Sequence, residues 1–178
     1  LTNNNKINLI KLKKNQGKGF AIIQGLKRAK YNKIIVFDGD MELATSDISG
    51  LMILDKKHSI HFIMGYRFEN LNLLKSNMDW GNFMFTTFFN ILFRSCHKDI
   101  LCCAKSFYLD EIEIDKINSN GFSIDVELTS LLTITNKNRK IPQILLQYNR
   151  RTTEEGKKLK VSDGWAILAK IIEMIKYY

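Results

Sequence analysis

The sequence predicts an α/β fold with a mostly parallel central sheet. Short apolar runs of strand length alternate with segments whose apolar residues recur at helical spacing, which is typical of successive βαβ units. The clearest strand is the run 34–37, where four consecutive apolar residues indicate burial on both faces of a sheet. Three acidic residues follow it at alternate positions: Asp38, Asp40 and Glu42. Ligands of open α/β sheets bind beyond the carboxyl ends of strands, so we expect the functional site there.

The other predicted elements continue this alternation. In the first helical segment, Ile22, Leu26 and Ala29 recur at helical spacing, and the run before it alternates as a strand does. Consecutive βα units favour parallel strands joined by right-handed crossovers. The predicted strands are 6–12, 33–38, 59–66 and 141–148, and the predicted helices are 20–30, 46–54, 78–94, 124–135 and 163–178.

Three of these helices have features of their own. The hydroxyl of Ser46 is placed to cap the helix that follows it. The segment 78–94 carries too many aromatic residues for one narrow stripe, which indicates a buried helix or one that contacts an apolar partner. The segment 163–178 is amphipathic, so it either packs on the core or lies on a membrane interface.

Length, charge and cysteine content narrow the class of protein. The 178 residues suit a single domain over 1–178 with a sizeable core. A net charge of +9 favours partners that carry phosphate, or an anionic membrane surface. The basic residues are dispersed without interleaved aromatics, so we expect no nucleic-acid partner. The three cysteines contain no CxxC pair and fit a cytoplasmic protein, and no apolar run has the length of a membrane span.

The acidic turn has two readings when taken alone. Asp and Gly are default turn residues, so Asp38-Gly39-Asp40 can be an ordinary turn after a strand. Its carboxylates are also the oxygen ligands that Mg²⁺ or Mn²⁺ prefers. The second reading predicts a divalent metal site.

Two groups of residues offer positive charge for phosphate. Gly17 and Gly19 permit close backbone approach, and Lys18 adds a cation beside a helix N-terminus, although such a loop can equally be a tight turn. Arg67 ends a predicted strand, and 150–160 holds further Arg and Lys residues. Arginine forks match phosphate oxygens, although each of these residues can instead belong to a solvated loop.

The ordered set of motifs resembles glycosyltransferase family 2, and within it the dolichyl- or polyprenyl-phosphate sugar transferase branch. The similarity covers nearly all of the chain from Asn15 onward, and 151–158 is its strongest single match. The matching segments are 15–19 with Ala21, 38–42, 65–67, Gly81-Asn82, 99–105, Gly121-Phe122 with Asp125 and Glu127, and 148–158 with Asp163-Gly164.

The resemblance implies a fold and a set of residue roles. The fold is the three-layer nucleotide-diphospho-sugar transferase (GT-A, Rossmann-like) fold. Asp38 and Asp40 would hold Mg²⁺ or Mn²⁺ on the donor pyrophosphate, with Glu42 as a further ligand. The residues expected to contact donor or acceptor phosphates are Lys18, Arg67, Lys105, Arg151 and Lys158, and Asp99, Asp125 and Glu127 fall at motif positions on the acceptor side.

The resemblance also implies an inverting glycosyltransferase. We expect a UDP- or GDP-linked sugar as donor and a polyprenyl or dolichyl phosphate as acceptor, at the cytosolic face of a membrane. A lipid phosphate is already an anionic nucleophile and needs no strong base. A saccharide hydroxyl, the alternative acceptor, needs a base, for which Asp125 and Glu127 are the candidates.

One departure from the family bears on activity. Family members usually begin with a strand ending in a Pro-x-Tyr-Asn-Glu type turn, then a helix and a second strand, which together hold the nucleotide base. None of this precedes Leu1, so the sequence predicts an N-terminally truncated domain. An inactive fragment that retains the fold is therefore a third possibility.

Overall fold

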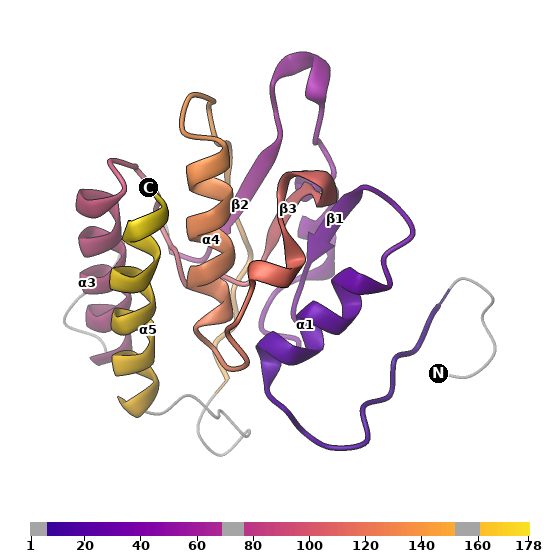
Figure 1. The fold of residues 1–178 in the computed structure, drawn as a ribbon, viewed down its shortest axis with the longest axis horizontal. Helices are drawn as coiled ribbons and strands as arrows, with labels where there is room; N and C mark the ends of the chain where they lie inside the picture. The colour runs from indigo at the N-terminus through magenta and orange to yellow at the C-terminus, as the bar shows by residue number, and fades with distance from the viewer. Residues whose placement is uncertain (1–6, 69–76, 152–160) are drawn as a thin grey trace.

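A computed structural model describes residues 7–68, 77–151 and 161–178 and shows an α/β fold (Figure 1). Its four strands form one sheet in the order β1-β3-β2-β4. The strands are β1 (Lys33–Val36), β2 (Phe62–Tyr66), β3 (Lys105–Tyr108) and β4 (Gln143–Leu145). The α/β class is confirmed.

The sheet is mixed rather than mostly parallel. β3 runs antiparallel to both of its neighbours, with Ile34 opposite Phe107 and Ile63 opposite Ser106, whereas β2 and β4 are parallel. β1, β2 and β4 therefore point the same way, but β3 separates β1 from β2. No strand is predicted at β3 because its four residues, which include a buried lysine, do not form an apolar run.

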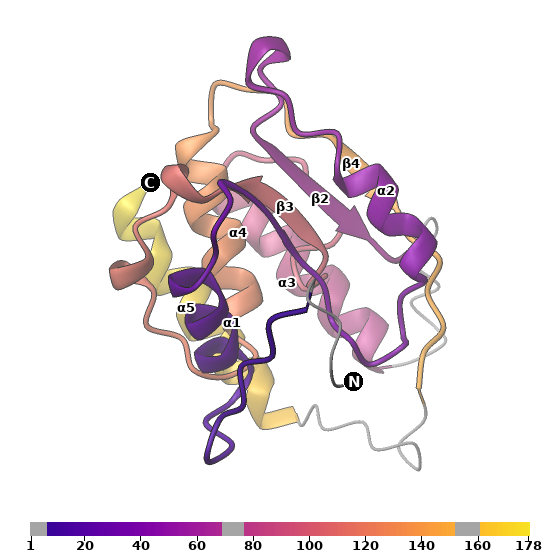
Figure 2. The same ribbon diagram turned by 90° about the vertical axis from the view of Figure 1, so that its right-hand side faces the viewer.

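Helices cover both faces of the sheet. The helices are α1 (Lys18–Lys27), α2 (Ile48–Leu51), α3 (Asn77–Leu92), α4 (Ile124–Thr135) and α5 (Val161–Met174). Side chains alternate between the faces of a strand, so Phe62 and Met64 pack with α1 and α4 while Ile63 packs with α2 on the other face. Figure 2 shows α2 beside β4, on the side of the sheet away from α1 and α4.

A third apolar cluster joins α3 and α5 to α4. It includes Phe89, Phe93, Val126 and Ile171, and the Phe93 ring lies 5.5 Å from the Tyr178 ring. The two outer helices run side by side in Figure 1. No helix within the described ranges is long and apolar enough to cross a membrane.

Several predicted boundaries shift. Helix 124–135 is confirmed at both ends, but residues 7–12 form no strand. The predicted helix after Ser46 is a 3₁₀ turn (Thr45–Asp47) followed by a single α-helical turn, and Ser46 does not cap it. Gly50 lies within that short helix, where the entropy lost on ordering glycine disfavours a longer one.

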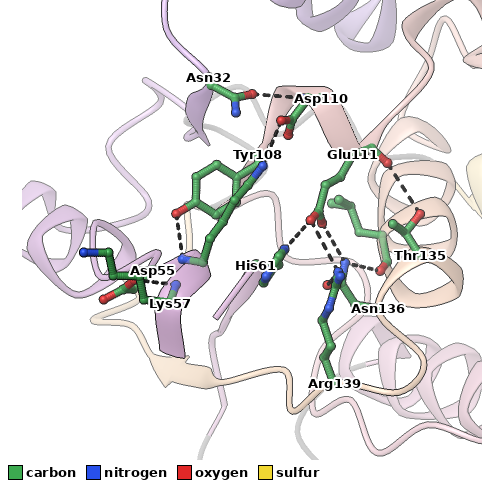
Figure 3. A network of polar contacts seen from close by, with 12 residues as sticks. Asn32, Asp55, Lys57, His61, Tyr108, Asp110, Glu111, Thr135, Asn136 and Arg139 are labelled. Atoms are coloured by element: carbon green, nitrogen blue, oxygen red, sulfur yellow. Dashed lines mark hydrogen bonds and ion pairs between the residues drawn. The ribbon is translucent and has the colours of Figure 1, made fainter. Parts of the chain in front are cut away.

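A polar network lies at the end of the sheet opposite the acidic turn (Figure 3). The carboxylate of Glu111 contacts His61 Nδ1 and accepts hydrogen bonds from Asn136 and Arg139, each at 3.3 Å. His61 precedes β2, and Asn136 follows α4, so this one carboxylate joins the sheet to the helix. The network is structural, since its members do not line the cleft described below.

His97 is buried without a charge. Thr133 Oγ1 donates its proton to the carbonyl of Thr129 at 2.6 Å, so His97 Nε2, which lies 2.8 Å from the same oxygen, must be the donor of that contact. Burial, and then the positive charge of Lys105, lowers the pKa of His97 to about 4.

This burial predicts a stability loss in acid. Because the unfolded histidine takes up a proton near pH 6.5 and the folded one near pH 4, the stabilisation is complete above pH 6.5 and is lost as the pH falls toward 4. Urea unfolding should show that wild type loses roughly 2–3 kcal/mol more than His97→Gln between pH 7 and pH 4. Parallel pH profiles for the two proteins would contradict this account.

Candidate functional site

A cleft of about 400 Å³ lies beyond the carboxyl ends of β1 and β2. The three acids after β1 line it, together with Lys18 and three arginines: Arg67 after β2, and Arg150 and Arg151 after β4. Two further walls come from helices, with Asp79 and Asn82 on α3 and Ile167 on α5. The predicted position of the site at the strand ends thus coincides with this cleft.

The carboxylates of the acidic turn are paired with cations. Asp38 Oδ2 lies 2.8 Å from Lys18 Nζ, and Asp40 Oδ2 lies 2.6 Å from Arg151 Nη2. Glu42 Oε1 accepts the backbone N–H of Arg151 at 3.2 Å. Side chains of Asp38 and Asp40 remain about one-third exposed, at 34% and 30%, so a ligand in the cleft can reach them.

Lys18 bridges two carboxylates from distant parts of the chain. Its Nζ lies 2.8 Å from Asp38 Oδ2 and 2.8 Å from Asp125 Oδ2, at the start of α4. Burial alone would lower the pKa of Lys18, but the charges of Asp125 and Asp38 outweigh it and raise the pKa. The ammonium therefore stays charged and ties the acidic turn to α4.

The glycines beside Lys18 allow the close backbone packing that places this lysine, rather than forming a phosphate-binding loop. Gly17 has φ +93°, and a Cβ there would lie 2.2 Å from the carbonyl oxygen of Asn120; a Cβ on Gly19 would lie 1.9 Å from that of Ser119. The N–H of Gly19 donates to the Asn120 carbonyl at 2.8 Å. The prediction of close backbone approach is right, but the partner is the chain's own backbone, so this donor is not free for an anion.

Arg67 forms a bidentate ion pair with Asp99. Its Nε and Nη2 donate to the two carboxylate oxygens at 2.7 and 3.0 Å, and the Asp99 side chain is 1% exposed. Burial alone would raise the pKa of Asp99, but Arg67 outweighs it and holds that pKa below its usual value. The predicted acceptor-side acid is therefore a buried partner that orients Arg67 at the cleft.

The two candidate bases on α4 point in different directions. Residues two apart on a helix lie roughly 200° apart around its axis. Asp125 lines the cleft, whereas Glu127 is 1% exposed and accepts the backbone N–H groups of Asn118 and Ser119 at 3.1 and 2.8 Å. The structure thus places Glu127, predicted as a candidate base, away from the cleft, with its carboxylate holding the loop before α4.

One predicted phosphate ligand, Lys105, does not line the cleft. Lys105 is fully buried on β3, where its ammonium contacts the carbonyl of Cys102 and lies 3.9 Å from Asp125 Oδ1. The structure thus gives the predicted phosphate ligand Lys105 buried protein partners and no exposed surface. Lys158 lies outside the described residues.

Asp79 lines the cleft but is not among the site residues predicted from the sequence. Its carboxylate pairs with Arg150 across the cleft, from α3 to the segment after β4. The sequence of α3 does carry an indication of this residue. Asp79, Asn82 and Thr86 place polar groups on the same helical stripe as the buried Phe89 and Phe93. Polar residues on a buried stripe indicate partners or a ligand.

The acids fit a divalent metal in type and position. Within the described part of the chain, no group of three or more His, Cys, Asp or Glu side chains is arranged as a ready-made metal cage. Mg²⁺ is usually bound by one or two protein carboxylates, with waters and substrate phosphates completing its ligands. Asp38 and Asp40 supply such a pair of oxygen ligands in one open cleft.

The Arg67–Asp99 pair predicts a specific stability defect. Arg67→Met leaves the Asp99 charge buried without its partner, so urea unfolding at pH 7 should show a loss of about 3 kcal/mol. The difference from wild type should shrink toward pH 3, because the wild type loses the stabilisation of the ionised carboxylate there, while the variant can protonate it.

A matched double variant checks the cause. Arg67→Met with Asp99→Asn removes the buried charge and should recover most of the loss. A double variant no more stable than Arg67→Met would show that the defect comes from lost packing instead.

Comparisons with known proteins give a family and a fold. The model of the family described as "Glycosyl transferase family 2" matches residues 1–113, which is more than half of the chain. Comparison with curated proteins finds no match. Among solved structures, glucosyl-3-phosphoglycerate synthase from Mycobacterium tuberculosis superposes with a TM-score of 0.64 in its UDP complex and 0.66 in its complex with Mn²⁺, UDP-glucose and phosphoglyceric acid. Its complex with Mg²⁺ and UDP gives 0.63.

These similarities differ in what they show. In each of the three structures the identity is 11%, with 90% of this chain and 55% of the other chain covered. At this identity the match shows the fold, and it confirms the predicted nucleotide-sugar transferase architecture. The chain spans about half the length of these proteins.

Proposed function

The chain belongs to glycosyl transferase family 2, and from that premise we propose that it moves a sugar from a UDP- or GDP-linked donor to a polyprenyl or dolichyl phosphate. The observation that carries the proposal is the cleft at the strand ends, where Asp38 and Asp40 lie beside Arg67 and Arg151. Carboxylates there suit a metal, and guanidinium groups suit phosphate oxygens. The binding of UDP with Mn²⁺ or Mg²⁺ by proteins of the same fold supports this class of donor.

Asp38 and Asp40 are the residues that would hold Mg²⁺ or Mn²⁺. When bound, such an ion neutralises the charge that develops on the departing nucleoside diphosphate. Arg151 lies 2.6 Å from Asp40 and so brings a fixed positive charge to the same part of the cleft. Preorganised charge of this kind stabilises a transition state without reorganisation at the moment of reaction.

An apolar surface next to the cleft supports a lipid-linked acceptor. On α3, the outward side chains are Trp80, Phe83, Met84 and Ile91, and on the neighbouring α5 the Trp165 side chain is 74% exposed. Exposed apolar residues gathered on adjacent helices mark an interaction surface. Both helices also contribute to the cleft wall, so a phosphate in the cleft can carry its chain along this surface. The proposal thus includes peripheral attachment at the cytosolic face of a membrane.

The arrangement around Asp125 also favours a phosphate acceptor. Its Oδ2 already accepts a hydrogen bond from the charged Lys18, so this oxygen is occupied and less available to a hydroxyl proton. An anionic phosphate needs no such base. Its oxygen attacks the anomeric carbon as the bond to the nucleoside diphosphate breaks on the opposite face, and the sugar configuration inverts.

One observation favours a saccharide hydroxyl as a second candidate acceptor. Asp125 Oδ1 is buried in the cleft wall and has no hydrogen-bond partner. A hydroxyl placed against this oxygen would have an acceptor for its proton. The two candidates therefore differ in whether activity depends on Asp125.

The metal assignment predicts the behaviour of Asp40→Asn. This variant should lose Mn²⁺-dependent binding of UDP and GDP sugars in calorimetry, because the neutral amide is a much weaker ligand than a carboxylate. The matched control is Asp115→Asn, whose carboxyl is 90% exposed and outside the cleft, and it should bind as wild type does. Failure of the wild-type chain to bind any of these donors would support the inactive-fragment alternative instead.

The acceptor proposal predicts a dependence on chain length. With labelled donor and Mn²⁺, wild type should glycosylate a long polyprenyl phosphate in vesicles faster than a saccharide or phosphoglyceric acid. Trp165→Ser should slow transfer to the long-chain acceptor several-fold while leaving transfer to a short, water-soluble prenyl phosphate unchanged, because only the long chain reaches the apolar surface.

Two outcomes would contradict this acceptor. Faster transfer to the saccharide, together with loss of that activity in Asp125→Asn, would establish the second candidate. Equal effects of Trp165→Ser on long and short acceptors would show that the surface takes no part in acceptor binding.

A further inference from the structure

Asn82 has an unpaired amide in the wall of the cleft. The residue is 5% exposed, it lies on α3, and it lines the cleft. Neither its amide nitrogen nor its amide oxygen has a hydrogen-bond partner. Buried polar groups in proteins are nearly always paired, so an unpaired donor and an unpaired acceptor on one side chain call for an explanation.

The neighbours of Asn82 on the same helical stripe are paired by the protein. Asp79, one turn before it, forms an ion pair with Arg150. Thr86, one turn after it, accepts the backbone N–H of Ile100 at 3.4 Å. The polar groups one turn before and one turn after Asn82 therefore have partners, whereas the amide of Asn82, in the cleft wall, has no hydrogen-bond partner.

The nearby Arg67–Asp99 ion pair does not form a hydrogen bond with the Asn82 amide. Asp99 directs both of its carboxylate oxygens to Arg67, at 2.7 and 3.0 Å. Burial raises and Arg67 lowers the pKa of Asp99, and a hydrogen-bond-like contact from the Asn82 side chain lowers it further. Neither amide atom, however, reaches hydrogen-bonding geometry with the carboxylate.

Buried polar atoms without a hydrogen bond gather at this cleft, although Arg151 Nε lies 3.5 Å from Glu42 Oε1 and Asp125 Oδ1 lies 3.9 Å from Lys105 Nζ. Of the six described residues that have them, three line it: Asn82, Asp125 and Arg151. The other three, His97, Ser106 and Ser119, lie elsewhere. A ligand in the cleft would pair the first three groups together, which is the simplest reason for their shared position.

We propose that Asn82 is a specificity residue that binds two neighbouring hydroxyl groups of the donor sugar, an inference that rests on the proposed function. The amide offers one acceptor and one donor side by side, and adjacent hydroxyls offer the matching donor and acceptor. An ionised phosphate oxygen only accepts, so it would leave the amide oxygen unpaired. The sugar, attached to the pyrophosphate near Asp38 and Asp40, lies in the same cleft as this amide.

Calorimetry in Mn²⁺ tests the proposal with four compounds: UDP, UDP-glucose, GDP and GDP-mannose. For the nucleotide that wild type binds, the sugar-linked form should bind more tightly than the nucleotide alone. Asn82→Leu should reduce affinity for the sugar-linked form roughly tenfold and leave affinity for the bare nucleotide unchanged, as expected for two lost hydrogen bonds.

Thermal unfolding and a matched variant separate this role from a structural one. Asn82→Leu should keep or raise the melting temperature, because it replaces an unpaired polar group by an apolar one of similar size. Thr86→Val changes a paired neighbour outside the cleft, so it should lower the melting temperature and leave the sugar preference intact.

The outcomes distinguish this inference from the function on which it rests. If wild type bound none of the four compounds, the proposed function would fail, and this inference with it. If wild type bound them and Asn82→Leu kept the full preference for the sugar-linked form, the inference alone would be overturned. A fall in melting temperature as large as that of Thr86→Val would overturn the claim that the amide is unpaired.

Discussion

The bridge made by Lys18 is the interaction on which the geometry of the cleft depends. One ammonium group joins Asp38, after the first strand, to Asp125, at the start of α4, with 2.8 Å to each carboxylate. The flanking glycines make this possible, because their backbone lies too close to residues 119 and 120 for any side chain. Charge balance follows from the same contact, since two carboxylates facing one cleft without a cation would repel each other.

The cleft keeps its charged groups in pairs that a ligand can exchange. Asp40 is paired with Arg151, and Asp38 with Lys18, so each candidate metal ligand already has a cation beside it. Asp38 and Asp40 would hold a metal ion that arrives with a nucleoside diphosphate, and the released Lys18 and Arg151 would then pair with the phosphates. Arg67 differs, because its buried partner Asp99 is 1% exposed and fixes it in place.

The sequence predicted what depends on neighbouring residues and missed what depends on distant ones. The acidic turn, helix 124–135 and the position of the site beyond the strand ends follow from local patterns, and the family resemblance is confirmed. The Lys18–Asp125 contact spans 107 positions, and no local pattern signals it. Strand β3 was missed because its buried lysine hides the apolar pattern. Glu127 lies away from the cleft that Asp125 lines, a separation that helical spacing alone predicts.

The most direct test is crystallography of this chain with Mn²⁺ and UDP or GDP, using the anomalous signal of the metal. The account predicts a manganese peak in direct contact with carboxylate oxygens of Asp38 and Asp40, with the diphosphate oxygens completing its ligands and Arg151 turned from Asp40 toward a phosphate. A nucleotide bound in the cleft without metal at these carboxylates, or manganese bound only elsewhere, would contradict it.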